Sequence, residues 1–268
     1  MRSVKCVGLL VIVMTLLSSP IWAQERGMFA YQSSGARAAG VGMSGIAMSG
    51  DAFASLINPS LLVECHGTSL ILGYDEVFNS NLTHNSLGLV SKVLKQPISI
   101  LYDCLSAQDI AYQESKLQLG LGRSVGNFAL GLNAKFYNIS SIETATGFGA
   151  DLGFLWQVRP NFTVGMLLKD LLSELNLSTG SEELLFMQAE AGCALNIPQL
   201  GTFFLQAGEG LRIGFEKWYS TNVALRGGLD DGNMTVGMSL VKKPWQIDYV
   251  FNTHLMGGTH QLSVTIRL

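Results

Sequence analysis

Apolar side chains recur at every second position along most of the chain after residue 67. In the stretch 128–137 one set of alternate positions is apolar and the other is mostly small or polar: Phe128, Leu130, Leu132, Ala134 and Phe136 against Ala129, Gly131, Asn133, Lys135 and Tyr137. Strict alternation over about eight or more residues indicates half-buried β-strands rather than helices. The pattern predicts about fourteen strands, over residues 68–76, 83–93, 97–105, 115–123, 128–138, 146–158, 162–171, 184–195, 201–208, 211–218, 221–228, 233–241, 245–252 and 260–268.

Polar segments and segments that contain Gly or Pro separate these runs, as hairpin connections require. They lie at residues 124–127, 159–161, 196–201, 230–233 and 242–244. For residues 169–185 the pattern leaves two alternatives open, a helical turn or a longer loop.

The face opposite the apolar set decides the class of β-protein. In a soluble sandwich that face meets water and carries Lys, Glu and Thr, whereas here it is rich in Gly, Ala, Ser, Asn and Gln, which suit a crowded barrel lumen. Trp156, Trp218 and Trp245 stand near strand ends, where lipid-facing barrels carry aromatic girdles. Because hydrocarbon tolerates no open sheet edge, we predict an all-β fold, a transmembrane antiparallel β-barrel over residues 68–268. A soluble exported β-protein is the alternative.

The first residues have the layout of a secretory signal peptide. Arg2 and Lys5 precede an apolar run over residues 6–17, and the small residue Ala23 ends the segment. Because the apolar run is too short to span a membrane, residues 1–23 are predicted to be a cleaved signal peptide. An uncleaved anchor is the alternative.

Composition narrows the function classes. Charged residues make up 14% of the chain, the mean hydropathy is +0.30 and the formal net charge is -3. With no basic field and no recognisable module, nucleic-acid binding is excluded. Past the signal peptide three cysteines remain, Cys65, Cys104 and Cys193, and an odd count cannot form a closed disulfide framework in an exported chain. One bridge plus a free thiol stays open, beside three isolated thiols.

A Gly/Ala-rich segment, residues 24–67, precedes the first predicted strand. Gly40, Gly42 and Gly45 have the G-x-G-x-x-G spacing of dinucleotide-binding loops, but no strand precedes them to build a βαβ unit. We predict instead a plug inside the barrel, in which glycines let the backbone pass close to the wall. Arg37 and Asp51 are its charged pair, expected to form an ion pair or to contact inward-facing wall residues, with ligand binding as the alternative.

Other candidate chemistry is sparse. Asn58 and Pro59 are expected to end a helical turn and direct the chain into the first strand, because a residue before proline disfavours helix. The four histidines are scattered and no G-x-S-x-G motif occurs, so we expect no catalytic residues, no metal site and no cofactor. The polar positions of the last strands form the remaining candidate set, either a structural network in the lumen or part of a solute path: Arg212, Glu216, Arg226, Asp248 and Arg267.

The stretch SGARAAGVGMSGIAMSGDAFASLINPSLL, residues 34–62, resembles the opening of PorV/PorQ-type outer-membrane proteins, within the wider group of FadL-like barrels. The last strands, from GLRIGFEKWYSTNVALRGGLDDGNMTVGMSL to GGTHQLSVTIRL, resemble the closing strands of the same family. The positions that match the opening motif are Arg37, Gly42, Gly45, Asp51, Ala52, Asn58 and Pro59, with Ser60 where alanine is commoner.

The resemblance implies a barrel of about fourteen strands with its N-terminal segment folded into the lumen, in the bacterial outer membrane. PorV and PorQ are partners of the type IX secretion machinery, so it implies a non-enzymatic role in protein secretion or cell-surface attachment. The alternative is a FadL-like channel for hydrophobic small molecules. The implied partners are outer-membrane lipid, secretion proteins or a hydrophobic ligand, and the outer-membrane assembly machinery, whose C-terminal signal the last strand resembles with Leu268 in place of the usual Phe.

Overall fold

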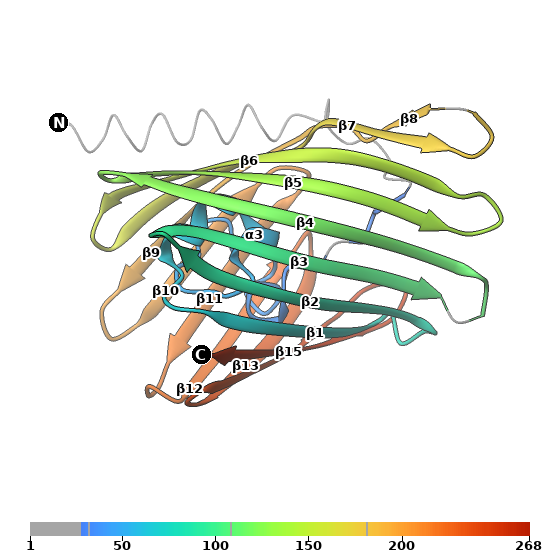
Figure 1. Cartoon of the computed structure of the whole chain (residues 1–268). Helices are drawn as coiled ribbons and strands as arrows, with labels where there is room; N and C mark the ends of the chain where they lie inside the picture. Colours follow the sequence, from blue (N-terminus) through green and yellow to red (C-terminus); the bar gives the residue numbers. More distant parts are fainter. Residues whose placement is uncertain (1–27, 32, 108, 181) are drawn as a thin grey trace.

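The computed structural model describes residues 28–268 except 32, 108 and 181 (Figure 1). The predicted signal peptide, residues 1–23, and the first four residues of the predicted plug segment lie outside the described residues. The first barrel strand begins at Ser69, next to the predicted boundary at residue 68.

The barrel is a single antiparallel sheet whose first and last strands pair with each other. Neighbouring strands pair in chain order, β1 pairs with β15, and β6 pairs with β7, so fourteen strands close into a ring and β8 adds a short flap on β7. The strands are β1 (Ser69–Val77), β2 (Leu82–Val93), β3 (Gln96–Ala107), β4 (Tyr112–Val125), β5 (Phe128–Ser140), β6 (Ala145–Arg159), β7 (Phe162–Leu177), β8 (Glu182–Leu184), β9 (Gln188–Ile197), β10 (Gly201–Ala207), β11 (Leu211–Trp218), β12 (Val223–Asp230), β13 (Asn233–Lys242), β14 (Trp245–Asn252) and β15 (Thr259–Arg267).

Apolar side chains lie on the outside of the barrel and polar side chains on the inside, the reverse of a soluble protein. This arrangement confirms the predicted fold class. Along β5 the apolar residues face outward, with Phe128 45% and Leu130 51% exposed. The alternate residues point into the lumen, where Asn133 and Lys135 are 1% and 4% exposed. An apolar outside and a polar inside, with no unpaired edge around the ring, are the requirements of a membrane-spanning barrel.

Residues 169–185 differ from both alternatives for this segment, the helical turn and the longer loop. β7 continues as a strand to Leu177, and the chain returns through β8 to form a short hairpin. The sequence hides this strand because the alternation is broken: Asp170 and Leu172 adopt positive φ, and the β6–β7 register shifts twice between Phe148 and Leu152. Bulges of this kind exchange inward and outward positions locally.

The two ends of the barrel differ. At the near end, where β1 begins and β15 ends, four of the turns have two residues, at 94–95, 126–127, 160–161 and 243–244. At the opposite, far end the connections 78–81, 108–111 and 141–144 have four residues and 253–258 has six, whereas 208–210 has three and 231–232 has two. The strands β4 to β7 are 13 to 16 residues long, whereas β10 to β12 have 7 or 8, so the far rim is high on one side and low on the other.

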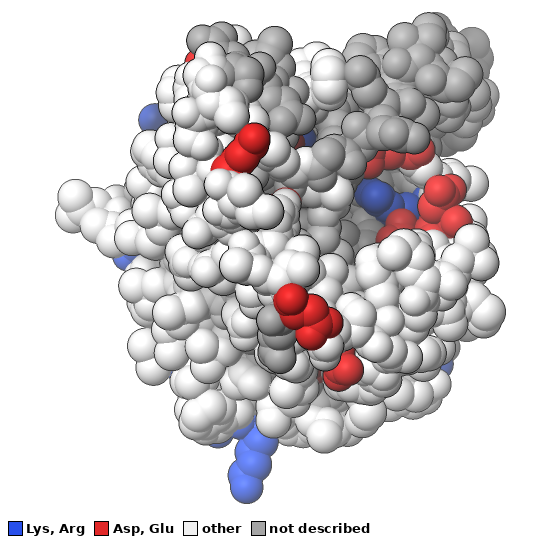
Figure 2. Space-filling model, turned by 90° about the vertical axis from the view of Figure 1, so that its right-hand side faces the viewer, with Lys and Arg blue, Asp and Glu red and all other residues white. Residues whose placement is uncertain are grey.

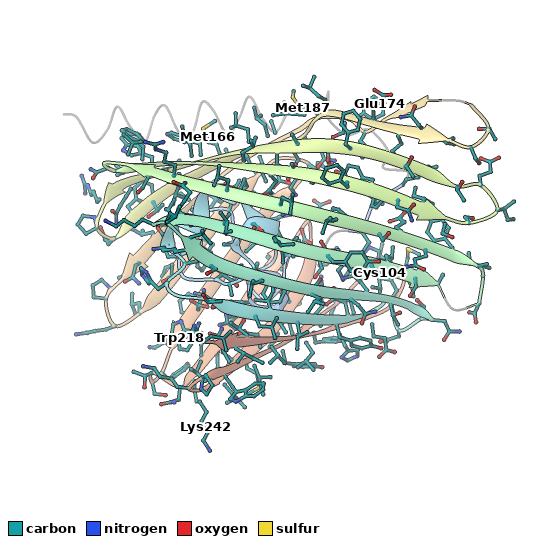
Figure 3. All side chains as sticks on the ribbon, viewed as in Figure 1. Cys104, Met166, Glu174, Met187, Trp218 and Lys242 are labelled. Atoms are coloured by element: carbon teal, nitrogen blue, oxygen red, sulfur yellow. The ribbon has the colours of Figure 1, made fainter. Side chains whose placement is uncertain are left out.

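The three tryptophans of the predicted girdle lie toward the near end, although only two of them face outward. Trp156 and Trp245 share the outward face of their strands with apolar neighbours. Trp218, at the end of β11, instead donates its indole N–H to Glu216 Oε1 at 3.0 Å, although it remains 39% exposed (Figure 3). Two of the predicted girdle positions are therefore placed as expected, and Trp218 belongs to the rim of the lumen.

The plug segment fills the lumen. Its described residues contain two short helices, α2 (Ala36–Ala39) and α3 (Ala54–Ile57), and a 3₁₀ helix, η2 (Pro59–Glu64). Many of its apolar residues form a buried cluster with apolar residues of the wall, and this cluster includes Val41, Ile46, Met48, Leu61 and Leu62, each at most 1% exposed. In the part of the chain that the structure describes, no helix has the length and hydropathy to span a membrane.

Candidate functional site

Glycines on the inner wall face the backbone of the plug. Gly42 has φ +66°, a conformation that glycine adopts without strain, and a Cβ on Gly228 of β12 would lie 2.4 Å from Gly42 N. Gly40 lies near Arg226 and Gly45 near Ala38, so all three glycines of the G-x-G-x-x-G spacing are in close packing. Other wall glycines would likewise clash with the plug if they carried a Cβ: Gly131, Gly153, Gly165, Gly192 and Gly214.

Asn58 ties three parts of the chain together. Its Nδ2 donates to Ile46 O of the plug at 3.0 Å and lies 3.4 Å from the carbonyl oxygens of Phe154 and Met166 on the wall. Its Oδ1 accepts from Ser60 at the start of η2. Asn58 therefore ends α3, as expected for the Asn-Pro pair, but the chain continues from Pro59 into a 3₁₀ helix before it reaches β1.

Arg37 holds the plug to the wall through Glu216 of β11. Its Nε and Nη2 donate to the two carboxylate oxygens of Glu216 at 2.9 and 2.8 Å, in the bidentate geometry that is strongest for this pair. Nη1 donates to Ser49 O at 2.9 Å. Of the alternatives for Arg37, the structure has the wall contact.

Glu216 is shared with a second arginine, which extends the network along the wall. Arg226 Nε donates to Glu216 Oε2 at 2.6 Å, and its Nη1 lies 3.3 Å from Asp248 Oδ1. Asp248 accepts from Gln246, and Gln246 Oε1 accepts from Arg267 at 2.6 Å. Four of the five lumen candidates, Glu216, Arg226, Asp248 and Arg267, therefore belong to one network.

Arg212, the fifth candidate, belongs to a separate cluster at the far end. Its Nε donates to Asp230 Oδ1 at 2.7 Å, and its Nη1 lies 3.4 Å from Glu190 Oε1, which Lys169 also approaches at 3.4 Å. Figure 2, which faces the far end, shows basic and acidic side chains together in a hollow. Both signs are paired in this cluster, so it has no large excess charge.

Asp51 and Cys65 adjoin each other in the plug. Asp51 Oδ1 accepts from Phe53 N at 2.9 Å, while Oδ2 is buried with no hydrogen-bond partner among the described residues. Cys65 Sγ donates to Asp51 O at 3.3 Å. All three cysteines in the described residues are free thiols, which settles the alternatives left by the odd count.

Alkylation of Cys65 should be slow in the folded barrel. Burial, with the nearby Asp51 carboxylate, raises the pKa of the Cys65 thiol to about 12, so the reactive thiolate is scarce at pH 8. We expect iodoacetamide to modify Cys65 roughly a hundredfold or more slowly than in the urea-unfolded chain, with a rate that keeps rising up to pH 11. Peptide mapping by mass spectrometry measures this at each cysteine separately. Equal rates in the folded and unfolded chains would contradict the burial of this thiol.

A cavity at the far end of the lumen was not anticipated from the sequence. Three aromatic rings line it, those of Phe29, Tyr31 and Tyr137, together with Leu105. Its polar lining consists of His84, Asp103, Glu114, Lys116 and Lys135. The register brings these residues together, because Leu105 pairs with Glu114, and Lys116 pairs with both Asp103 and Tyr137. β3, β4 and β5 each contribute two alternate residues and β2 contributes one, so the site is spread over four strands and no local motif marks it.

Metal binding gains no support from the arrangement. Among the described residues no group of three or more His, Cys, Asp or Glu side chains could hold a metal ion. What the geometry defines is a membrane-spanning barrel with a fixed internal plug and a cavity on the far side of that plug.

Known structures share this architecture. The toluene transporter TodX of Pseudomonas putida is similar with a TM-score of 0.63 and 11% identity, covering 90% of this chain and 98% of TodX. A FadL homologue of Pseudomonas aeruginosa is similar with a TM-score of 0.64 and 10% identity, covering 87% of this chain and 98% of the homologue. Comparison with protein-family models gave no match, and comparison with curated proteins gave none either.

At this level of identity the likeness establishes the fold alone, a β-barrel like those of the two solved structures. Both structures are transport or FadL-type barrels by their descriptions. The narrower resemblance to PorV/PorQ-type proteins stays a prediction from the sequence.

Proposed function

We propose that the protein is a bacterial outer-membrane channel of the FadL-like kind, which admits small molecules past its plug. The observation that carries the proposal is the division of the lumen: the plug packs against the wall, and a cavity remains on one side of it. The toluene transporter TodX has the same fold, which supports hydrophobic small molecules as a candidate cargo.

The proposed orientation follows from the turns. Outer-membrane barrels have short periplasmic turns and longer extracellular loops. The near end has four of the five two-residue turns, and the far end has the longest connection between consecutive strands, residues 253–258. The near end is therefore assigned to the periplasm and the far end, with the cavity, to the cell exterior. A solute would therefore meet the cavity first and the plug second. Contacts with outer-membrane lipid and with the assembly machinery belong to the same proposal.

Transport past the plug can be tested by locking the plug to the wall. Ala36 N donates to Ser263 Oγ of β15 at 2.8 Å, so Ala36→Cys with Ser263→Cys places two thiols at a plug–wall contact. The three native cysteines are first changed to serine. In a Gram-negative host we expect uptake of a radiolabelled monoaromatic hydrocarbon above the empty-vector level, lost on oxidation of the pair and restored by reduction.

The single variant Ala36→Cys is the matched control and should transport under both conditions. Uptake by the unlocked barrel that equals the empty vector would overturn the transport function. Uptake that persists in the oxidised pair would overturn passage by way of the plug.

The second candidate function is a PorV/PorQ-type partner in protein secretion or surface attachment. The supporting observation is that apolar side chains of two far-end loops are exposed to solvent: Ile142 and Leu255 are fully exposed, and Met256 is 71% exposed. The two loops are separated around the ring by six strands, β5 to β1 and β15, so each loop tip would offer a partner its own exposed apolar contact. This function predicts a secreted or surface protein that co-purifies with the barrel and is lost when Ile142 and Leu255 are changed to serine. Retention of that protein by the double variant would contradict a role for these tips.

A further inference from the structure

The far-end cavity has more carboxylates around it than cations. Lys116 Nζ lies 3.3 Å from Asp103 Oδ2. Lys135 forms ion pairs with both Asp151 and Asp170, so one lysine there meets two carboxylates. Asp103 and Glu114 line the cavity beside Lys116 and Lys135, and Asp75, Asp151 and Asp170 pair with its lining residues His84 and Lys135 from behind. The cavity and the partners of its lining therefore contain five carboxylates against two lysines.

Glu114 supplies an unused acceptor at the cavity. Its Oε1 accepts from Phe29 N at 2.9 Å and from Tyr112 OH at 2.5 Å, while neither bond uses Oε2. Glu114 is 5% exposed, and among the described residues no lysine or arginine pairs with it. A buried carboxylate without a cation is costly, and a cationic ligand would relieve that cost.

Two further buried polar atoms at the cavity lack hydrogen bonds among the described residues. They are Asp103 Oδ2 and His84 Nδ1, on side chains that are 6% and 5% exposed. His84 Nδ1 lies 3.3 Å from Asp75 Oδ2, which Tyr31 OH already bonds at 3.0 Å. Native proteins leave few buried polar groups unsatisfied, so atoms of this kind beside a cavity indicate a bound molecule.

The aromatic lining specifies the rest of the ligand. The rings of Phe29 and Tyr31 border the same cavity as Glu114 and Asp103. Aromatic faces attract cations and also bury apolar area, so the lining suits an apolar body with a positive group. An anion would meet lysines that are already paired, and a neutral hydrocarbon would desolvate the carboxylates without compensation.

We propose that the far-end cavity binds a small organic cation, a primary ammonium on an aromatic or short aliphatic body, and this proposal rests on the transport function proposed above. The N–H donors of the ammonium match Glu114 Oε2, which the bonds from Phe29 and Tyr112 leave unused, and Asp103 Oδ2, which has Lys116 as an ion-pair neighbour at 3.3 Å but no hydrogen bond. The ring or chain lies against Phe29 and Tyr31. The cavity then retains cationic solutes more strongly than neutral ones of the same size, while neutral solutes still pass it on the way to the plug.

Three probes with the same ring and different charge test this class. Calorimetry on the detergent-purified full barrel compares benzylammonium, benzyl alcohol and benzoate. We expect benzylammonium to bind, benzyl alcohol to bind at least about tenfold more weakly, and benzoate not to bind, because a hydrogen bond to a charged group contributes a factor of this size. Equal binding of the cation and the alcohol, tighter binding of benzoate, or no binding of any probe overturns the proposal.

Two variants move the affinity in opposite directions. Glu114→Gln removes the unpaired charge and should weaken benzylammonium binding about tenfold, whereas Lys116→Gln removes a competing cation and should strengthen it. A gain of affinity cannot arise from misfolding, and heat-modifiable migration in electrophoresis checks the fold of both. Asp230→Asn, which removes a carboxylate at the same end but outside the cavity, should leave the affinity within about twofold.

Unchanged binding by Glu114→Gln would overturn the assignment of that carboxylate. Because calorimetry needs no transport, its outcome is independent of the uptake experiment. Binding without uptake would overturn the transport function alone, and uptake without binding would overturn the cation site alone.

Discussion

Replacing Glu216 by alanine should loosen the plug and lower the stability of the barrel by about 3–5 kcal/mol, because two buried arginines would lose their shared carboxylate. Arg37 and Arg226 both donate to Glu216, and Arg226 is fully buried at its side chain. Thermal unfolding in detergent measures the loss of stability. Planar-bilayer conductance measures the opening, and we expect long-lived ion currents that the wild-type barrel does not show.

The two partners of this ion pair should differ in their effects. Arg37→Ala leaves Glu216 with Arg226 and should cost clearly less stability than Glu216→Ala, although it frees the same plug. Asp231→Asn, at an exposed turn between β12 and β13, is the control and should change neither stability nor conductance, because asparagine tolerates the positive φ of this position. A Glu216→Ala barrel with wild-type unfolding and no current would show that the network does not hold the plug.

Adding one methyl group at Gly228 should displace the plug, whereas the same change at Gly227 should be harmless. The two glycines are neighbours on β12 and point to opposite faces of the sheet. A Cβ on Gly228 would lie 2.4 Å from Gly42 N and from Val41 C, and both are backbone atoms that no side-chain rotation can move aside. A Cβ on Gly227 would find its nearest neighbour, Thr235 O, at 3.7 Å, which is an ordinary contact.

We expect Gly228→Ala to cost about 1–3 kcal/mol, the usual cost of overpacking a filled core, and to raise protease cleavage within residues 36–64. Limited proteolysis of both variants, followed by mass spectrometry, measures plug displacement directly. Equal protection of the plug in Gly228→Ala and Gly227→Ala would contradict the close approach of Gly42 to the wall.

The strands, and the face of each strand that points into the lumen, could be predicted because alternation is a local signal. Every residue of the polar set along β5 turned out to face the lumen, and the chain closed without an open edge. The β7–β8 hairpin could not be predicted in the same way. Its bulges and the positive φ of Asp170 reverse the alternation, so the local pattern no longer reports which face a residue occupies.

The candidate site was predictable only in part. Alternation shows whether a side chain points into the lumen or outward, but not its position along the barrel axis. Glu216 and Arg226 could be assigned to the lumen, yet their pairing with Arg37 depends on where the plug crosses the wall. The far-end cavity shows the same limit more strongly. His84, Asp103 and Glu114 lie on three strands, and only the register brings them to one place.

The unequal height of the two sides of the rim determines the direction from which the far end can be approached. Outward apolar residues run from Phe128 to Phe136 on β5 and from Val223 to Leu229 on β12, so the lipid-facing bands are of similar height. Beyond its apolar band β5 continues with outward polar residues, Asn138 and Ser140. This part of the wall extends past the lipid and blocks access to the lumen from that side. The mouth of the barrel therefore opens sideways, over β10 to β12, along the membrane surface. A molecule that dissolves in the lipid headgroup layer can reach it by two-dimensional diffusion, without first leaving the membrane.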